Sequence, residues 1–289
     1  MARAPSPTTD GQDDQRRLAV LIDADNVQPA VIEGLLAEVA KFGIASVKRI
    51  YGNWTSDQMG QWKSKLLMHS LNPVQQFAYT SGKNATDSSL IIDAMDLMYT
   101  RRFDGFCLVS SDSDFTRLAQ RLREEGLIVY GFGERKTPAA FVAACDKFVY
   151  TEVLRPAVSG PAASTPATSP AAPAAKRGRG AKAGDTATAR KPASAPPPPP
   201  AAAAAAGKAS AAMPVQLVRR AIEEASDDSG WATLGAVGTW LTKVQPDFDP
   251  RLHGHKKLSD LLRSAPAQFA VEARDRPGGK KVLFVRVAG

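Results

Sequence analysis

Aspartates follow apolar, strand-like runs at several points of this 289-residue sequence, and their spacing could support metal-dependent chemistry. The acids that we single out are Asp23, Asp87, Asp112 and Asp114. Carboxylates that are brought close together repel one another, and a bound divalent cation is the usual relief. Because the donors are oxygens and no His or Cys stands near them in the sequence, the expected ion is Mg²⁺ or Mn²⁺ rather than Zn²⁺.

Each acidic segment also has an ordinary structural explanation, and these alternatives stay open at this point. Asn26 could cap a helix that begins near Pro29, and Ser113 or Asp114 could cap the helix that follows them. Asp87 stands at the start of an expected helix, where the helix dipole favours an acid. Capping alone does not explain why the acids gather directly after strand-like runs.

The elements that must position these acids alternate between strand and helix over the first 155 residues. Short apolar runs typical of buried strands lie at 18–22, 46–51, 73–78, 105–110 and 127–132, with a last one at Phe148. Apolar residues at helical spacing mark 29–42, 56–70, 88–99, 115–125 and 137–144. This alternation predicts an α/β fold with a parallel sheet covered on both faces. In such sheets, ligands bind beyond the carboxyl ends of the strands, near the switch point in strand order.

Three motifs carry a resemblance to a known family. They are LIDADN (21–26), GKNATD (82–87) and SSDSDF (110–115), and in this order and spacing they resemble the NYN domain, the LabA-like branch of the PIN-like ribonuclease superfamily. We assign residues 17–155 to this domain. The resemblance implies a Rossmann-like sheet and metal-dependent cleavage of RNA. It also implies catalytic and metal-binding roles for Asp23, Asp87, Asp112 and Asp114, with Asn26 and Lys83 beside the substrate.

Two other acids near these motifs are given lesser roles. Asp25 follows Asp23 by two residues and would face away on an extended strand end, so we expect it to support the site. Asp93 lies six residues after Asp87, about 240° around a helix, and should not point to the same place. Asp23-Ala24-Asp25 also fits the DxD motif of haloacid-dehalogenase-type phosphatases, which remain a weaker alternative because the later motif SSDSDF differs from theirs.

Basic residues are in excess only behind residue 155. The chain holds 37 Lys and Arg against 29 Asp and Glu, and the net charges are −1 for 1–155, +6 for 156–212 and +3 for 213–289. In the middle segment, 34 of 57 residues are Ala or Pro, and large apolar side chains are almost absent. Such a segment cannot bury enough apolar surface to offset the loss of chain entropy on folding. We therefore predict a disordered basic linker at 156–212 and a flexible tail at 1–16. The basic excess favours contact with a polyanion such as RNA.

Residues 213–289 are expected to form a second compact unit. Amphipathic helices at 215–225, 234–241 and 256–264, followed by strands near 269–271 and 282–285, have the order of a winged helix. The strings GWATLGAVGTWL (230–241) and PDFDPRLHGHKKLSDLL (246–262) resemble the OST-HTH/LOTUS domain, which implies RNA binding or docking of a protein partner. Lys256 and Lys257 open the third helix and are candidates for substrate binding, whereas Trp231 and Trp240 are expected in the core.

Composition argues against several other classes of protein. No apolar run approaches the roughly 20 residues of a membrane span, and the N-terminal stretch lacks the pattern of a secretory signal. Two Cys and three His are too few for a disulfide scaffold or a typical zinc site. The sequence predicts a cytoplasmic, metal-dependent ribonuclease whose C-terminal module recruits RNA. The alternative is a non-catalytic RNA-binding adaptor with an idle acidic pocket.

Overall fold

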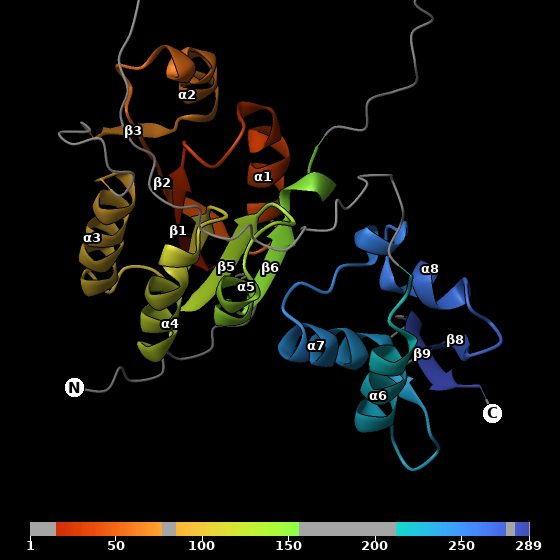
Figure 1. The fold of residues 1–289 in the computed structure, drawn as a ribbon. Helices are drawn as coiled ribbons and strands as arrows, with labels where there is room; N and C mark the ends of the chain where they lie inside the picture. Colours follow the sequence, from red (N-terminus) through yellow and green to blue (C-terminus); the bar gives the residue numbers. More distant parts are fainter. Residues whose placement is uncertain (1–15, 77–84, 156–211, 276–280, 289) are drawn as a thin grey trace, which may run out of the picture. The chain divides into compact units, whose positions relative to one another are not determined.

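The computed structural model describes residues 16–76, 85–155, 212–275 and 281–288. The tail predicted at 1–16 lies outside these ranges except for its last residue, and so does the linker except for Ala212. These ranges form an N-terminal domain (16–155) and a C-terminal domain (212–288) (Figure 1).

The N-terminal domain is built on a six-stranded sheet in which every neighbouring pair is parallel. The strands are β1 (Arg17–Asp23), β2 (Ile44–Gly52), β3 (Asn72–Gln75), β4 (Gly105–Val109), β5 (Ile128–Gly133) and β6 (Lys147–Tyr150). Their order in the sheet is β3-β2-β1-β4-β5-β6. The direction of strand order therefore changes between β1 and β4, so the predicted Rossmann-like sheet is confirmed and its switch point lies between these two strands.

Helices cover both faces of this sheet. They are α1 (Ile32–Val39), α2 (Lys63–His69), α3 (Ala85–Tyr99), α4 (Thr116–Glu124) and α5 (Ala139–Ala144), with 3-10 turns η1 (Pro29–Val31), η2 (Asp57–Trp62), η3 (Ser113–Phe115) and η4 (Thr151–Val153). The strand β1 shows why both faces need cover, because Leu18, Val20 and Ile22 pack toward α1 and η2. Its alternate residues Ala19 and Leu21 pack instead toward α3, α4 and α5 (Figure 1).

The observed helices and strands differ from the predicted ones mainly at their ends. The helices expected at 29–42, 56–70 and 115–125 each begin with a 3-10 turn before the α-helix. The third strand is short, Asn72–Gln75, and part of the stretch predicted for it lies outside the described residues. Such ends depend on local backbone hydrogen bonds that a hydrophobic pattern does not encode.

The C-terminal domain has the predicted helix and strand order. Its elements are α6 (Val215–Ala225), β7 (Ala232–Thr233), α7 (Leu234–Val244), η5 (Pro250–His253), α8 (Leu258–Arg263), β8 (Phe269–Asp275) and β9 (Lys281–Val287). The strands form an antiparallel sheet in the order β7-β9-β8. The two-residue strand β7 was not predicted, because so short a segment carries no periodic pattern. The hydrophobic core of the C-terminal domain includes Val218, Val237, Leu241, Leu261 and Val285.

None of the helices in the described ranges combines the length and the apolar character that crossing a bilayer requires.

Candidate metal centre

Three chain segments bring the predicted acids to the carboxyl-terminal edge of the parallel sheet. β1 ends at Asp23, and the neighbouring strand β4 leads into Asp112 through Ser110 and Ser111. Asp87 arrives from the first turn of α3. The acids therefore meet at the switch point between β1 and β4, where a parallel sheet of this order binds its ligands.

Asp87, Asp112 and Asp114 form a compact group, which we call the acidic triad. One carboxylate oxygen from each lies within 4.8 Å of those of the other two. Asp87 is buried, Asp112 is half-buried and Asp114 is exposed. Burial, followed by the negative charges of Asp23, Asp112, Asp114 and Asp25, raises the pKa of Asp87 to about 6. Crowded carboxylates with an open side offer the oxygen ligands that a hard divalent cation prefers.

Asp23 lies beside the triad with its carboxylate held by hydrogen bonds. Its Oδ2 accepts from the Asn26 amide at 2.6 Å and from the Ser110 hydroxyl at 2.9 Å, and its Oδ1 accepts from the backbone N–H of Asp25 at 3.0 Å. Asp23 is completely buried, and burial raises its pKa although these hydrogen bonds oppose the shift. The carboxylate is thereby fixed in place next to Asp87.

Helix capping and clustering of the acids occur together, although the capping residue is not the one expected. Asp112 caps η3, because its Oδ1 accepts from the backbone N–H of Asp114 at 3.0 Å. Ser113 and Asp114, proposed as caps, lie within η3 itself. Asn26 does not cap the helix after it but donates to Asp23. Since a carboxylate has two oxygens, the cap at Asp112 leaves the second one for a ligand.

The sequence motifs contain further residues that hold the site, whose roles had not been assigned. The Ser110 hydroxyl donates to Asp23 and accepts from the backbone N–H of Asp112 at 3.1 Å, so one side chain connects both strand ends. The hydroxyl of Thr86 donates to Asp25 at 3.2 Å, which agrees with a supporting role for Asp25. Ser110 could have been suspected only from its position as the first residue after β4.

The other candidates are placed apart from the triad or outside the described residues. Lys83 lies outside the described ranges. Asp93 forms an ion pair with Arg49 and accepts from the hydroxyl of Tyr51, so it does not face the triad, as its position on the helix predicted. Lys256 and Lys257 are exposed and belong to the C-terminal domain, where Lys257 immediately precedes α8.

The C-terminal domain carries aromatic side chains covered by arginines. Trp231 is 7% exposed, and the guanidinium carbons of Arg274 and Arg286 lie 4.3 and 4.9 Å from its ring centroid. Trp240 packs against the core and has Arg220 at 6.0 Å from its ring. Both tryptophans therefore contribute to the packing of the domain, as expected from the sequence, and leave charged groups at the surface.

Models of two families match the chain. The NYN domain matches residues 17–153, and the OST-HTH/LOTUS domain matches residues 208–281. Both resemblances and their order along the chain are thus confirmed. A search of curated proteins finds no match.

Several solved structures are similar to parts of the chain. The solution NMR structure of an uncharacterized protein from Nitrosomonas europaea is 46% identical, with 31% of this chain and 86% of that one covered and a TM-score of 0.26. A solution NMR structure from Chromobacterium violaceum is 38% identical, covering 25% of this chain and 77% of that one with a TM-score of 0.22. The crystal structure of a protein of unknown function from Vibrio parahaemolyticus is 20% identical, covering 48% and 95%, with a TM-score of 0.40.

Proposed function

Because this chain combines an NYN domain with an OST-HTH/LOTUS domain, we propose that it is a metal-dependent ribonuclease whose C-terminal domain recruits the RNA. The NYN domain suggests a nuclease, and both domains support a role on RNA. The observation that carries the proposal is the acidic triad at the switch point of the sheet. A phosphatase of the haloacid-dehalogenase type lacks comparable support.

The donor set suits Mg²⁺ or Mn²⁺. Asp87, Asp112 and Asp114 would hold the ion, since their oxygens lie close together and the mutual repulsion of the three charges is relieved by a cation. When bound, a divalent cation lowers the pKa of water and stabilises the negative charge that develops on phosphorus-bound oxygens. Within 16–76 and 85–155 no Cys stands in this group, which argues for a hard ion over Zn²⁺.

The chain's own residues orient the reacting groups. The hydrogen bond from Ser110 to Asp23 connects the ends of β1 and β4, and Asp112 is in turn fixed by its cap to η3. Asp114, exposed at the edge of the triad, can accept a proton from the attacking water. No His lies in these motifs to act as acid and base through a cyclic phosphate, so the expected products carry a 5′ phosphate and a 3′ hydroxyl.

The function is tested with the full chain and labelled single-stranded RNA, incubated in parallel with Mn²⁺, Mg²⁺ or a chelator. We expect cleavage that the chelator abolishes and that Asp112→Asn lowers by about 100-fold or more, because the variant removes a ligand charge without changing shape. Asp57→Asn is the matched control, since Asp57 is exposed and lies in η2, and it should retain full activity.

Two outcomes would contradict the proposal. Turnover that is unchanged by both the chelator and Asp112→Asn would exclude metal-dependent hydrolysis at the triad. Binding of RNA without any turnover would identify the protein as the alternative, an RNA-binding adaptor.

A further inference from the structure

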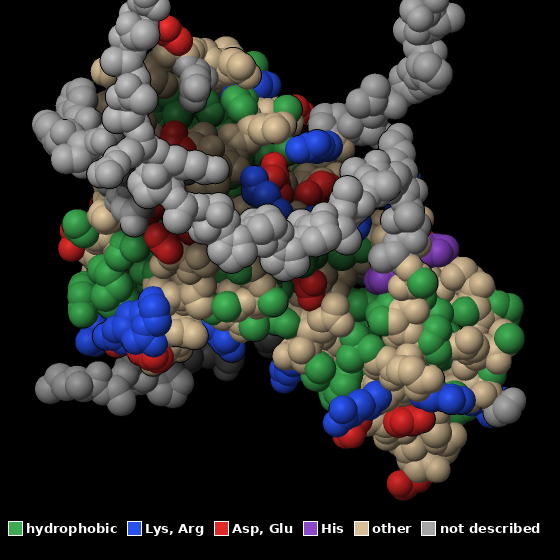
Figure 2. All heavy atoms as spheres, viewed as in Figure 1, with side chains coloured by type: hydrophobic (Ala, Val, Ile, Leu, Met, Phe, Trp, Pro, Cys, Tyr) green, Lys and Arg blue, Asp and Glu red, His purple; other side chains and the backbone are tan. Residues whose placement is uncertain are grey.

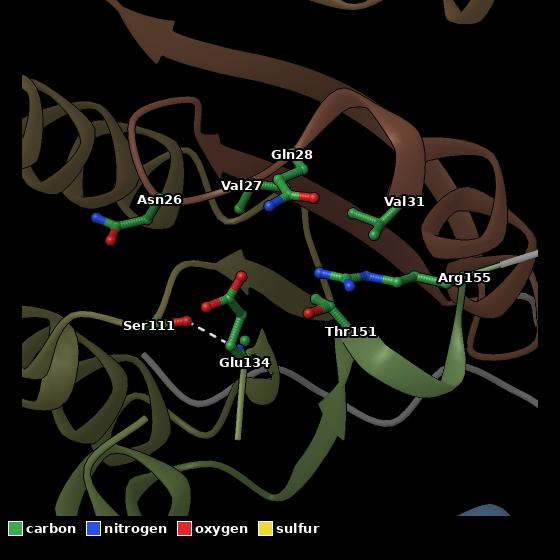
Figure 3. Close-up of a pocket in the computed structure, with 9 residues that line it drawn as sticks. Asn26, Val27, Gln28, Val31, Ser111, Glu134, Thr151 and Arg155 are labelled. Atoms are coloured by element: carbon green, nitrogen blue, oxygen red, sulfur yellow. Dashed lines mark hydrogen bonds between the residues drawn. The ribbon is translucent and has the colours of Figure 1, made fainter. Parts of the chain in front are cut away.

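A small polar recess lies beside the acidic triad at the same edge of the sheet. Its volume is about 10 Å³, room for one group the size of a water molecule. The residues around it follow four different strand ends (Figure 3). They include Asn26 and Gln28 after β1, Ser111 after β4, Glu134 after β5, and Thr151 and Arg155 after β6.

The side-chain hydroxyl of Thr151 is a hydrogen-bonding group in this recess. Thr151 is only 4% exposed, and among the described residues its hydroxyl has no hydrogen-bond partner. Figure 3 shows this side chain turned toward the space between Gln28 and Glu134. The hydroxyl oxygen is open to the recess, so an oxygen of a ligand in the recess can take up the hydrogen bond that this hydroxyl can donate.

A hydrogen-bond acceptor faces the recess from Glu134. The backbone N–H of Glu134 donates to the hydroxyl of Ser111 at 2.8 Å, which fixes this segment against the end of β4. Its Oε2 forms an ion pair with Lys136 at 3.0 Å, and Oε1 has no partner among the described residues. The recess thus offers a hydroxyl that can donate and a carboxylate that can accept, and a ligand hydroxyl satisfies both.

Two residues that line the recess also adjoin the residues of the acidic site. Asn26 lines it and donates to Asp23, while Ser111 lines it and directly precedes Asp112. The guanidinium of Arg155 enters from the opposite side in Figure 3 and has no ion-pair partner among the described residues. In Figure 2, acidic and basic side chains lie close together on this domain near the ends of α1 and β6.

We propose that the recess receives the ribose 2′-hydroxyl of the nucleotide adjoining the scissile phosphate. Thr151 donates to this hydroxyl, Glu134 accepts from it, and Arg155 contacts the neighbouring phosphate. The inference rests on the proposed ribonuclease function and adds the group by which the site distinguishes RNA from DNA, because only RNA carries the 2′-hydroxyl.

The test uses the full chain and an RNA oligonucleotide in which single 2′-deoxy residues replace each position around the main cleavage site. We expect one position at which the deoxy substitution lowers kcat/KM by roughly tenfold or more, since it removes the ligand hydroxyl that pairs with Thr151 and Glu134. In Thr151→Val, ribo and deoxy substrates of that position should be cleaved at similar rates. Thr151→Ser keeps the hydroxyl and should keep the discrimination.

Thr100→Val serves as the matched control. The hydroxyl of Thr100 donates to the backbone oxygen of Leu97 just after the end of α3, so this variant should discriminate as the unmodified chain does. RNA cleavage with no sensitive position, or discrimination that survives in Thr151→Val, would overturn the recess as a 2′-hydroxyl site while leaving the ribonuclease function intact. A complete absence of RNA cleavage would overturn both.

Discussion

At the scale of single residues, Asp87 links the charge of the triad to the stability of the domain. Its pKa is about 6 in the folded chain and near 3.8 in an unfolded one, so ionisation opposes folding. The stabilising contribution of the protonated form is complete below pH 3.8 and is lost as the pH rises through 6. The pKa shift corresponds to a change in the free energy of unfolding of at most about 3 kcal/mol. Access of solvent to the carboxylate lowers this change to roughly 1–2 kcal/mol.

We therefore expect Asp87→Asn to stabilise the metal-free protein at pH 7.5 but not at pH 4. The measurement is urea unfolding of both proteins with a chelator present, and the quantity of interest is the difference between them at each pH. Taking this difference cancels the carboxylates that do not interact with Asp87, so it reports the removal of the Asp87 charge from its acidic neighbours. A difference that stays constant from pH 4 to 7.5 would show that Asp87 is not held at a raised pKa.

The sequence predicted the acids of the site better than their individual roles. Spacing after strand-like runs placed Asp23, Asp87, Asp112 and Asp114 at one edge of a parallel sheet, and the structure brings three of them within one small volume. The fourth acid, Asp23, accepts hydrogen bonds beside this group, and one of them comes from Ser110, which is 87 residues away along the chain. Pairing between distant strand ends is set by tertiary packing, which a single sequence pattern does not contain.

At the scale of secondary structure, a close backbone approach holds the end of the domain against α1. A Cβ at Gly34 would lie 2.2 Å from the backbone oxygen of Leu154, so only glycine fits there. Leu154 stands between Thr151 and Arg155, which line the polar recess. The position of that recess wall therefore depends on one glycine in a helix that contributes no ligand to the triad.

Gly34→Ala is expected to lower the free energy of unfolding by about 1–2 kcal/mol. The clash should cost about 1–3 kcal/mol, which outweighs the gain in helix propensity of up to about 1 kcal/mol. Gly60→Ala is the control, because nothing lies within 4 Å of a Cβ there, and its stability should stay within about 1 kcal/mol. The measurement is the melting temperature of Gly34→Ala and of Gly60→Ala. Equal melting temperatures of the two variants would show that Leu154 moves away freely.

The hydrophobic pattern was sufficient for the central elements and insufficient at the edges. β1, β4 and β5 are continuous apolar runs buried on both faces, which is why their position and parallel pairing could be predicted. The strand β7 has two residues and pairs with β9, a contact between segments about fifty residues apart. Its existence follows from the fold of the C-terminal domain and not from any local signal.

At the scale of the whole molecule, the charge is divided between the chain's parts. Residues 1–155 have a net charge of −1, whereas 156–289 together have +9. If the basic part supplies affinity for RNA, Lys256→Ala combined with Lys257→Ala should raise KM for long RNA several-fold and leave kcat for short RNA unchanged. The slope of log affinity against log salt should become shallower by about 1.4, as expected for two lost contacts to a single strand.

The control removes two positive charges elsewhere. Arg101 and Arg102 are exposed and lie just after α3, before the start of β4, so Arg101→Ala with Arg102→Ala should leave the salt dependence unchanged. An equal effect of both double variants would mean that net charge alone attracts RNA. No effect of the lysine variant would favour protein docking by the C-terminal domain.

The shortness of β3 has a consequence for how the protein behaves at high concentration. Among the residues that the structure describes, β3 has β2 as its single neighbour in the sheet, contains four residues and includes Pro73, which has no N–H to offer. A strand from another molecule that approached this side would find few groups with which to pair. The described part of this edge therefore offers little support for edge-to-edge aggregation of two molecules.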